Sequence, residues 1–365
     1  MERLRRLHDE FGQSPWLDNL TRGYLTSGQL VALREAGVRG LTSNPTIFQK
    51  AIEGSPDYDE QFRTLAGAAI EDAYWAMVLA DIRGALDVFA PVHDASDGAD
   101  GFVSVEVSPA LAQDTEGTAA AARRLSDAID RPNLMIKIPA TCAGLPAIRA
   151  MIAEGRSVNV TLIFGLDRYA DVMEAYLAGL EDRARIPGAD LSNVASVASF
   201  FISRVDTEID RRLDAIGSPE ALALRGRAAV AQAKLAYRRF RTVFSGPRWE
   251  ALAARGARVQ RPLWASTSTK NPAYPDTLYV DELIGPDTVN TLPDATLAAF
   301  ADHGRPARTV DVGLDAAEAS WTALAGLGVN VADVADRLET EGLAAFSKSF
   351  DELLGSLDAK AHGLR

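Results

Sequence analysis

Two ionisable side chains stand inside short apolar segments that have the character of buried strands. Lys137 lies in NLMIKIP, residues 133–139, and Glu106 lies in GFVSVEV, residues 101–107. Lysine and glutamate are almost never fully buried unless they are paired or used. A desolvated amine can attack a carbonyl carbon and form a Schiff base, and a nearby acid or base must then move protons as water leaves. Lys137 is therefore a candidate nucleophile, and Glu106 is a candidate proton relay.

A purely structural explanation is open for the same two residues. Lys137 could extend its amine towards solvent or form an ion pair, and Glu106 could be its partner. The two explanations do not exclude each other, because a Schiff-base lysine also needs an acid or base within reach.

The other strand-like segments show the same alternation of apolar and polar residues. Side chains of a strand point alternately to its two faces. In SVNVTLIF, residues 157–164, Val158, Val160 and Leu162 share one face, and polar residues share the other. The polar rows of the segments hold Ser104, Glu106, Lys137, Asn159, Thr161 and Ser199. Because most of these lie near the carboxyl ends of their segments, where barrel enzymes keep their chemistry, they are predicted to meet inside a barrel.

Several residues in the predicted loops are expected at the same end of the barrel, next to the carboxyl ends of the strands. Asp18 ends SPWLD, Thr42 and Asn44 lie in GLTSNPTIF, Arg204 follows Ser199 at a predicted helix start, and Lys270 lies among hydroxyl residues in ASTSTKNP. Common structural roles are open for several of them: Asp18 could cap a helix expected at 27–36, Asn44 could stabilise a turn, and Arg204 could form a surface salt bridge. Asn159 and Thr161 could likewise be hydrogen bonders at turns or strand ends. An arginine near a helix N-terminus also suits a phosphate group.

The elements that must position these residues follow from hydrophobic periodicity. Short apolar segments alternate with longer segments of helical period, which favours a parallel (β/α)₈ barrel over other α/β folds. A doubly wound open sheet is the second choice, but no G-x-G-x-x-G follows a first strand. We expect strands at about 14–20, 38–44, 101–107, 133–139, 157–164, 193–200, 259–266 and 287–293. Helices are expected at 70–89, 113–129, 143–154, 166–180, 201–215 and 219–243.

The whole chain, residues 1–365, is interpreted as one barrel domain, because no Pro- or Ser-rich linker and no internal repeat interrupts it. The Ala- and Arg-rich stretch 217–256 is interpreted as a helical insertion packed on the outside of the barrel. Residues 314–358 are expected to form two or three closing helices.

Composition excludes several classes of function. The chain has 365 residues and a net charge of -12, which argues against nucleic acid or an anionic membrane as a partner but leaves an anionic substrate open. One cysteine, Cys142, fits a reducing compartment, and with no apolar leader or membrane span the expected location is cytoplasmic. The four histidines lack metal-site spacing, and neither G-x-S-x-G nor a P-loop occurs.

Five segments, in this order, resemble the motif series of the transaldolases. They are GLTSNPTIF (40–48), SVEVSPALAQDT (104–115), NLMIKIPAT (133–141), SVNVTLIF (157–164) and SFFISRVDTEID (199–210). The resemblance spans about residues 14 to 310. The helical stretch together with RPLWASTSTKNPAYPDTLYV, residues 261–280, is similar to the longer actinobacterial-type branch.

This resemblance implies a (β/α)₈ barrel and class I aldolase chemistry without a metal or organic cofactor. It implies that Lys137 forms the Schiff base, that Glu106 relays protons through a water, and that Asp18 takes a proton from the substrate's C4 hydroxyl. Thr161 is implied to help hold that water. The residues implied to line the site or bind substrate are Thr42, Asn44, Asn159 and Ser199, with Arg204 on phosphate.

One position departs from the family pattern. Shorter transaldolases carry a second phosphate-binding arginine after the seventh strand, where this chain has ASTSTKN with Lys270 as the nearest cation. Lysine can replace arginine as a point charge but not as a bidentate fork. Ser266 and Lys270 are the residues assigned to phosphate here.

The implied activity moves a dihydroxyacetone unit from sedoheptulose 7-phosphate or fructose 6-phosphate to glyceraldehyde 3-phosphate or erythrose 4-phosphate, within the pentose phosphate pathway. One alternative is the fructose 6-phosphate aldolase subgroup, which releases free dihydroxyacetone. That subgroup has glutamine where Glu106 stands and tyrosine where Phe201 stands, so both positions favour transfer. A second alternative, a non-catalytic sugar-phosphate binding barrel, would not need Lys137, Glu106 and Asp18 together. No oligomeric state is predicted.

Overall fold

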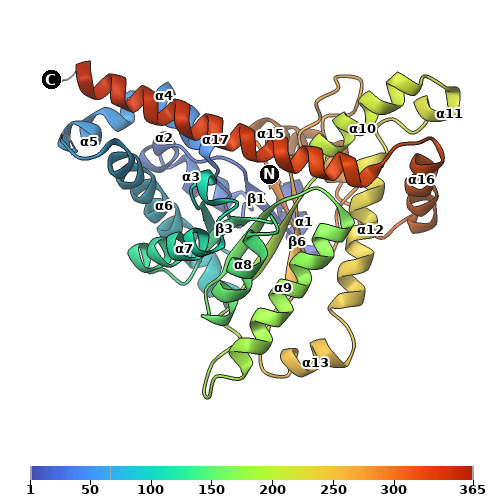
Figure 1. Ribbon diagram of the computed structural model, residues 1–365, viewed down its shortest axis with the longest axis horizontal. Helices are drawn as coiled ribbons and strands as arrows, with labels where there is room; N and C mark the ends of the chain where they lie inside the picture. Colours follow the sequence, from blue (N-terminus) through green and yellow to red (C-terminus); the bar gives the residue numbers. More distant parts are fainter. Residues whose placement is uncertain (1, 66, 364–365) are drawn as a thin grey trace.

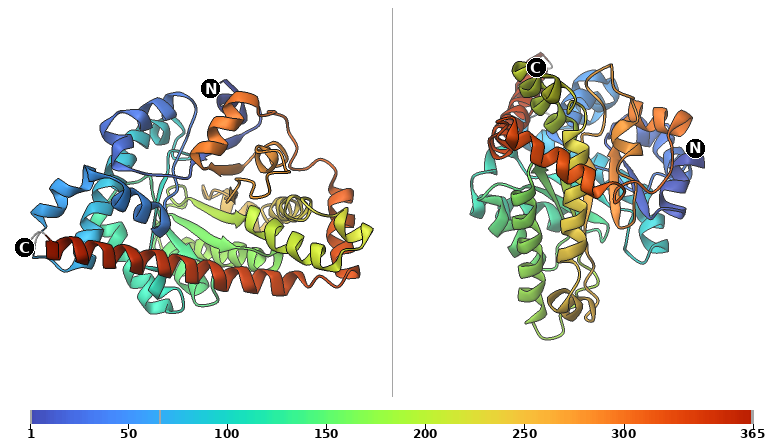
Figure 2. Two further views of the ribbon diagram at one scale, coloured as in Figure 1. Left: turned by 90° about the horizontal axis from the view of Figure 1, so that it is seen from above. Right: turned by 90° about the vertical axis from the view of Figure 1, so that its right-hand side faces the viewer.

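A computed structural model describes residues 2–65 and 67–363. Its centre is a curved parallel sheet surrounded by helices (Figures 1 and 2). The strands are β1 (Gln13–Leu17), β2 (Val103–Glu106), β3 (Leu134–Pro139), β4 (Val158–Ile163), β5 (Ser196–Phe201), β6 (Gln260–Ala265) and β7 (Thr288–Leu292). Within the described ranges their order is β1-β7-β6-β5-β4-β3-β2, and every pairing is parallel. This arrangement confirms the predicted (β/α)₈-barrel class.

The predicted strand at 38–44 is wrong as a regular strand. Leu41 alone forms parallel bridges, to Leu17 on one side and to Val103 on the other, so this segment still closes the gap between β1 and β2. Arg39 N donates to Pro15 O at 2.8 Å, but Pro15 has no N–H with which to extend the ladder. The backbone also approaches closely here, because a Cβ on Gly40 would lie 2.6 Å from the Trp16 ring.

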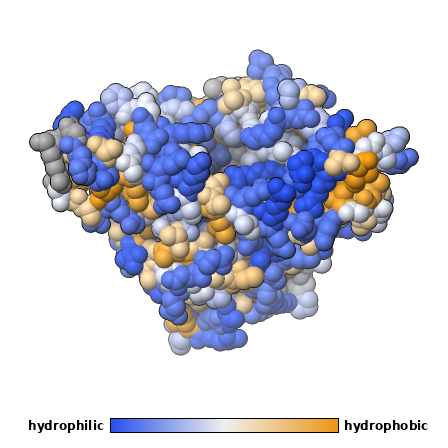
Figure 3. Space-filling view, turned by 45° about the horizontal axis from the view of Figure 1, so that its top comes forward, coloured by the Kyte–Doolittle hydropathy of each residue, from blue (hydrophilic) through white to orange (hydrophobic). Residues whose placement is uncertain are grey.

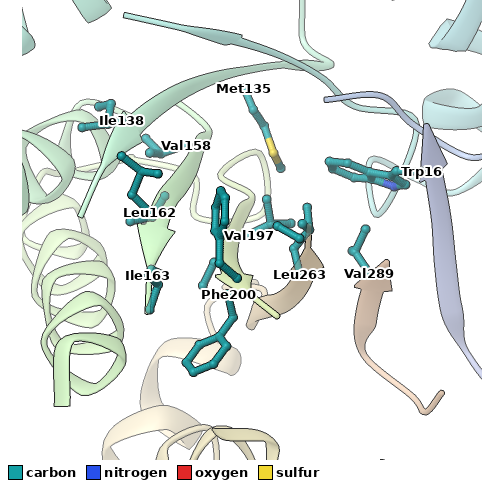
Figure 4. Packing of buried hydrophobic residues seen from close by; sticks show 14 of the residues in the cluster. Trp16, Met135, Ile138, Val158, Leu162, Ile163, Val197, Phe200, Leu263 and Val289 are labelled. Carbon is teal, nitrogen blue, oxygen red and sulfur yellow. The ribbon is translucent and has the colours of Figure 1, made fainter. Parts of the chain in front are cut away.

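Apart from an irregularity near the end of β4, the alternation of side chains along the strands is as the sequence predicts. Met135, Val197, Leu263 and Val289 point into the space enclosed by the strands, and Phe200 points outward (Figure 4). The Phe200 ring packs at right angles against that of Tyr169, in the helix layer, with centroids 5.7 Å apart. The next inward positions towards the carboxyl ends therefore belong to the polar row.

The helices cover the outside and the carboxyl-terminal end of this sheet. They are α1 (Glu2–Asp9), α2 (Arg22–Thr26), α3 (Gln29–Glu35), α4 (Pro45–Gly54), α5 (Asp59–Thr64), α6 (Ile70–Ala95), α7 (Thr115–Ile129), α8 (Gly144–Ala153), α9 (Leu166–Ala184), α10 (Ser203–Ile216), α11 (Pro219–Leu222), α12 (Ala228–Val243), α13 (Pro247–Ala253), α14 (Leu278–Asp281), α15 (Asp294–His303), α16 (Leu314–Gly326) and α17 (Val331–Gly363), with short 3₁₀ turns η1 (Pro56–Tyr58) and η2 (Pro109–Leu111). None of these described helices is long and apolar enough to cross a bilayer.

Residues 217–256 form α11, α12 and α13, and α12 packs against α9, α10, α16 and β6. Its alanine-rich face is buried, with Ala229, Ala233, Ala236 and Phe240 almost inaccessible. Tyr237 of α12 donates a hydrogen bond to Pro286 O at 3.1 Å. The segment therefore lies in the layer that covers the outside of the sheet.

The long helix α17 runs across the molecule beside the barrel's open end and contacts α4, α6, α10 and β4 (Figures 1 and 2). The helices expected over 314–358 are α16 and α17. Gly342 lets α17 come close, because a Cβ there would lie 3.2 Å from Leu162 and 3.4 Å from an Arg204 nitrogen. Phe346, one turn further along α17, shares that face.

A buried carboxylate joins several segments at the amino-terminal end of the barrel. Asp100 accepts hydrogen bonds from Ser14 Oγ and, at 2.9 Å, from Trp16 Nε1. It also pairs with Arg39 Nε at 2.7 Å and Arg261 Nη2 at 3.5 Å. Burial opposes ionisation of Asp100, but the charges of Arg261 and Arg39 and the Ser14 hydrogen bond outweigh it and hold its pKa below the usual value.

Candidate active site

Lys137 and Glu106 form a buried pair on neighbouring strands. The β2–β3 register places Glu106 opposite Lys137, and Nζ lies 3.0 Å from Oε2. Nζ donates a hydrogen bond to Ser43 O at 3.1 Å. Its contact with Oε2 of Glu106 is an ion pair without hydrogen-bond geometry, and among the described residues Oε2 has no hydrogen-bond donor. Burial raises the pKa of Glu106, and the positive charge of Lys137 opposes that rise. The pair thus holds an amine and a proton acceptor in contact.

A cavity of about 310 Å³ opens beside Lys137 at the carboxyl-terminal end of the strands. Figure 3 shows this side of the molecule, where hydrophilic side chains predominate. Nine of the eleven predicted site residues line the cavity: Asp18, Thr42, Asn44, Lys137, Thr161, Ser199, Arg204, Ser266 and Lys270. Residues from most strands and from α4, α10 and the β6–α14 loop therefore converge on one point.

The remaining two predicted residues lie behind the cavity wall. Glu106 contacts Lys137 from the β2 side. Asn159 is fully buried; its Nδ2 donates to Ser104 Oγ at 3.0 Å, and its Oδ1 accepts from Ser199 Oγ at 2.7 Å. Asn159 thus orients Ser199, which does line the cavity.

Asp18 follows β1 directly and is held by a chain of hydroxyl groups. Thr42 Oγ1 donates to Asp18 Oδ1 at 2.7 Å, and Thr42 and Thr291 hydroxyls lie 2.6 Å apart. Burial raises the pKa of Asp18, while the Thr42 hydrogen bond and the charge of Lys137 lower it. A carboxylate with a raised pKa is a better proton acceptor than an ordinary aspartate.

Thr161 lies at an irregularity of β4. The register with β5 shifts between Val160 and Ile163, and Leu162 has φ 59°, a left-handed conformation that is rare for leucine. The shift turns Ile163 to the outer row, which strict alternation from Thr161 would not predict. Thr161 Oγ1 is buried and has no hydrogen-bond partner within residues 2–65 and 67–363. Since buried hydroxyls are seldom left unpaired, this atom is suited to a water or a substrate hydroxyl.

Three further cations line the same cavity. Arg204 lies in the first turn of α10, Lys270 in the β6–α14 loop, and Lys50 on α4. No carboxylate of the described residues lies within 4.0 Å of these three side chains. Burial, together with the charges of Arg204 and Lys50, lowers the pKa of Lys270, and burial lowers the pKa of Arg204. Cations that lack an ion-pair partner and line one cavity favour binding of an anion.

The sequence analysis missed several residues of the cavity. Lys50, Ser268, Thr291 and Phe346 line it without having been predicted. Thr291 could have been found, because it stands at the carboxyl end of the last predicted strand. Phe346 could not, because a phenylalanine on a helix looks like an ordinary core residue; its ring centroid lies 5.8 Å from Lys137 Nζ.

Asn44 has a structural role as well as a place in the cavity wall. Its Oδ1 accepts a hydrogen bond from Ile47 N at 3.0 Å and so caps α4, with Pro45 at the first helical position. Ser266 has φ 56° and its hydroxyl lies 2.8 Å from that of Ser203, at the start of α10. The β6–α14 loop and α10 are therefore in contact beside Arg204.

A larger cavity of about 790 Å³ lies near the amino-terminal ends of β2 to β5. Its arginines are already engaged: Arg156 pairs with Asp127 at 2.8 Å, and Arg258 donates to Ser192 O at 2.8 Å. Its described lining contains no lysine that could form a Schiff base. In the part of the chain that the structure describes, no three His, Cys, Asp or Glu side chains gather as metal ligands would.

Comparison with known proteins agrees with the geometry. The family model of transaldolase/fructose-6-phosphate aldolase matches residues 15–357. The chain is 56% identical over 350 residues to a transaldolase of Parafrankia sp., covering 95% of each chain. It is 56% identical over 355 residues to a transaldolase of Thermobifida fusca, covering 96% of each, and 54% identical over 365 residues to transaldolase 1 of Streptomyces coelicolor, covering 98% of this chain and 95% of that one. The chain therefore belongs to the transaldolase/fructose-6-phosphate aldolase family.

Proposed function

We propose that this protein is a transaldolase, which transfers a dihydroxyacetone unit from a ketose phosphate to an aldose phosphate through a Schiff base on Lys137. The observation that carries the proposal is the buried contact of Lys137 with Glu106 beside a cavity that is also lined by Asp18 and by three cations without an ion-pair partner among the described residues. An anionic phosphate suits the cations, and a ketone carbonyl suits the amine. The single cysteine supports a cytoplasmic location.

The reaction begins with attack of the neutral Lys137 amine on the C2 carbonyl carbon of sedoheptulose 7-phosphate or fructose 6-phosphate. Glu106 is near enough to take the proton that the amine must lose. The resulting carbinolamine then loses its hydroxyl as water, with a proton returned from Glu106 through a water held by Thr161. The product is an iminium ion, whose positive nitrogen accepts electrons in the next step.

Carbon–carbon cleavage follows when Asp18 takes the proton of the C4 hydroxyl. The electron pair of the C3–C4 bond moves into the iminium, C4 becomes an aldehyde carbon, and an aldose phosphate leaves. The three-carbon enamine stays on Lys137. Its C3 attacks the aldehyde of glyceraldehyde 3-phosphate or erythrose 4-phosphate, Asp18 returns the proton, and hydrolysis of the iminium frees the new ketose. Thr42 and Ser199 are placed to bind sugar hydroxyls.

The family also contains fructose 6-phosphate aldolases, so the acceptor is the discriminating reactant. Glu106 and Phe201 support transfer, since the aldolase subgroup that the chain resembles less has glutamine and tyrosine there. An assay with fructose 6-phosphate should yield sedoheptulose 7-phosphate only when erythrose 4-phosphate is added. Release of free dihydroxyacetone at the same rate without an acceptor would instead identify an aldolase.

Replacing Glu106 with glutamine should lower kcat about 10²- to 10³-fold, because a positioned proton relay contributes on that order. Burial raises the pKa of Glu106. In the pH profile of the wild-type rate, activity should therefore rise with pH as Glu106 ionises, and the midpoint of that rise should lie above the usual pKa of a carboxyl group. Initial rates from pH 4 to 9 and a thermal melt of both proteins would measure this. An unchanged kcat in folded Glu106→Gln would remove Glu106 from the relay.

Replacing Lys50 with alanine should raise KM for glyceraldehyde 3-phosphate about 3- to 10-fold, because a charge-assisted contact to phosphate is lost in a partly exposed site. The turnover number should stay close to that of the wild type. Lys348→Ala on α17 is the matched control, since Lys348 is an exposed lysine that pairs with Glu352 at 3.7 Å away from the cavity lining. Equal KM values in Lys50→Ala and wild type would exclude Lys50 from phosphate binding.

A further inference from the structure

The loop after β6 places Lys270 at the cavity although most of the loop is exposed. Thr267 and Thr277 are buried, and the residues between them are exposed or half-buried. Thr267 Oγ1 donates to Thr291 O at 3.1 Å at the start of the loop, and Asp276 meets His303 at 2.8 Å on the surface near its end. Lys270 itself makes only a local hydrogen bond, to Ser268 Oγ. Its position therefore depends on what holds the middle of the loop.

The middle of the loop is tied to α10 by a tyrosine and an aspartate. Tyr274 Oη donates to Asp210 Oδ2 at 2.5 Å, and Asp210 Oδ1 accepts from Gly226 N at 3.0 Å. The Tyr274 ring packs flat against the backbone of Gly226, where a Cβ would lie 2.8 Å from the ring and φ is 68°. Asp210 thus connects the loop to the segment that leads into α12 through two hydrogen bonds.

A second contact of the same kind lies one turn earlier on α10. Asp206 Oδ2 accepts from Tyr279 Oη at 2.8 Å, and Asp206 Oδ1 accepts from Ala229 N at 3.0 Å. Asp206 and Asp210 stand on one face of α10, because residues four apart on a helix are neighbours. Burial raises the pKa of both carboxyl groups, that of Asp206 to about 6. Buried carboxylates of this kind are retained at a cost, which suggests that the contacts they make are used.

These contacts connect two of the cavity's cations, Arg204 and Lys270. Arg204 and Asp210 belong to the same helix, and Lys270 and Tyr274 belong to the same loop. The Asp210–Tyr274 hydrogen bond therefore sets the loop at a given distance from the helix that carries Arg204. On the other side of the aspartates, backbone N–H groups of residues 226–229, at the start of α12, donate hydrogen bonds to them. The helical stretch 217–256 thus helps to fix the two aspartates.

We propose that Asp210 and Tyr274 are positioning residues for substrate phosphate: their hydrogen bond holds the β6–α14 loop so that Lys270 and Arg204 face the same anion. The proposal rests on the proposed function, since it assigns the anion to a sugar phosphate. The two residues would act through Lys270, because neither Asp210 nor Tyr274 lines the cavity. Braced loops of this kind lose less conformational entropy when they bind a ligand.

The test compares wild type, Tyr274→Phe, Lys270→Ala and the double variant in the transfer assay. Tyr274→Phe keeps the ring on Gly226 and removes only the hydroxyl. Its KM for glyceraldehyde 3-phosphate should rise about fivefold with kcat unchanged, the size expected when one hydrogen bond of typical net strength is lost. In the Lys270→Ala background the same change should have no further effect on KM, because the side chain to be positioned is gone.

Controls separate this role from stability and from the proposed function. Tyr237→Phe removes a comparable tyrosine hydrogen bond on α12, to Pro286 O, and should leave KM unchanged. Asp210→Asn, which retains an acceptor for the tyrosine, should raise KM less than Tyr274→Phe does. A lower melting temperature with unchanged KM, or equal KM increases in the presence and absence of Lys270, would overturn the proposal. An inactive but folded wild type would refute the proposed function instead.

Discussion

Replacing Lys137 with alanine will reduce transfer from fructose 6-phosphate by about four orders of magnitude or more, the loss expected when a covalent nucleophile is removed. No other described amine forms an ion pair with Glu106: the other two lysines of the cavity, Lys50 and Lys270, stand on α4 and the β6–α14 loop. They cannot replace an amine that projects from β3 between Glu106 and Ser43 O. Steady-state rates with a coupled dehydrogenase would measure the loss.

Trapping the intermediate tests the same residue directly. Borohydride reduces an iminium to a stable amine, so wild type incubated with fructose 6-phosphate and borohydride should carry a three-carbon adduct on the peptide that contains Lys137. Lys137→Arg keeps the positive charge next to Glu106 but cannot form an imine, because guanidinium is not deprotonated in proteins. It should fold, remain inactive and show no adduct. An adduct on another lysine, or substantial activity in either variant, would refute the assignment.

Replacing Asp100 with asparagine will lower the free energy of unfolding by about 3 kcal/mol, the order found when one partner of a buried ion pair is removed. Asparagine preserves the shape of the side chain but leaves Arg39 and Arg261 facing each other without a counter-charge. The Asp100 contacts also join β1, the bridging segment at Leu41 and β6, so the closure of the barrel depends on them. Guanidinium unfolding followed by tryptophan fluorescence would measure the change in midpoint.

The stabilisation by Asp100 should depend on pH in a defined direction. Its pKa is lower in the folded protein than in the unfolded chain, so its contribution is complete above about pH 4, the unfolded value, and declines as pH falls through the folded pKa. Wild type should therefore lose its advantage over Asp100→Asn in acid. Asp87→Asn is the control, because Asp87 pairs with Arg131 at 3.5 Å on the surface, where ion pairs contribute little. Equal midpoints for all three proteins would disprove the role of Asp100.

Much of the candidate site is predictable because strand alternation is a local property. Each strand turns every second side chain inward, so the inward placing of Glu106, Lys137 and Thr161 can be read without knowing which strands pair. Because barrel active sites lie at the carboxyl ends of the strands, these residues are then expected to lie near Asp18. Alternation failed at Ile163, where a bulge shifts the register by one residue, because nothing in the local pattern marks that shift.

Residues on helices and loops were harder to find, because their direction depends on how the helices pack. Lys50 has the appearance of a solvent-exposed lysine on an amphipathic helix, and it joins the cavity only because α4 lies beside the barrel mouth. Phe346 has the appearance of a core residue, and it covers Lys137 only because Gly342 allows α17 to approach Arg204. The expected strand at 38–44 shortened to bridges at Leu41 alone for a similar reason, since Pro15 in the neighbouring strand β1 has no N–H to donate to it.

The amino-acid order already predicts the chemistry proposed for this protein: an amine and a carboxylate at inward strand positions and a second carboxylate at the end of a strand, within motifs that resemble those of the transaldolases. It does so because side-chain type and strand period are local. The distances that make the chemistry work belong to the folded chain. Contacts such as 3.0 Å between Lys137 and Glu106, or 2.5 Å between Tyr274 and Asp210, join residues 31 and 64 positions apart, and they exist only when the strands pair and the helices pack around them.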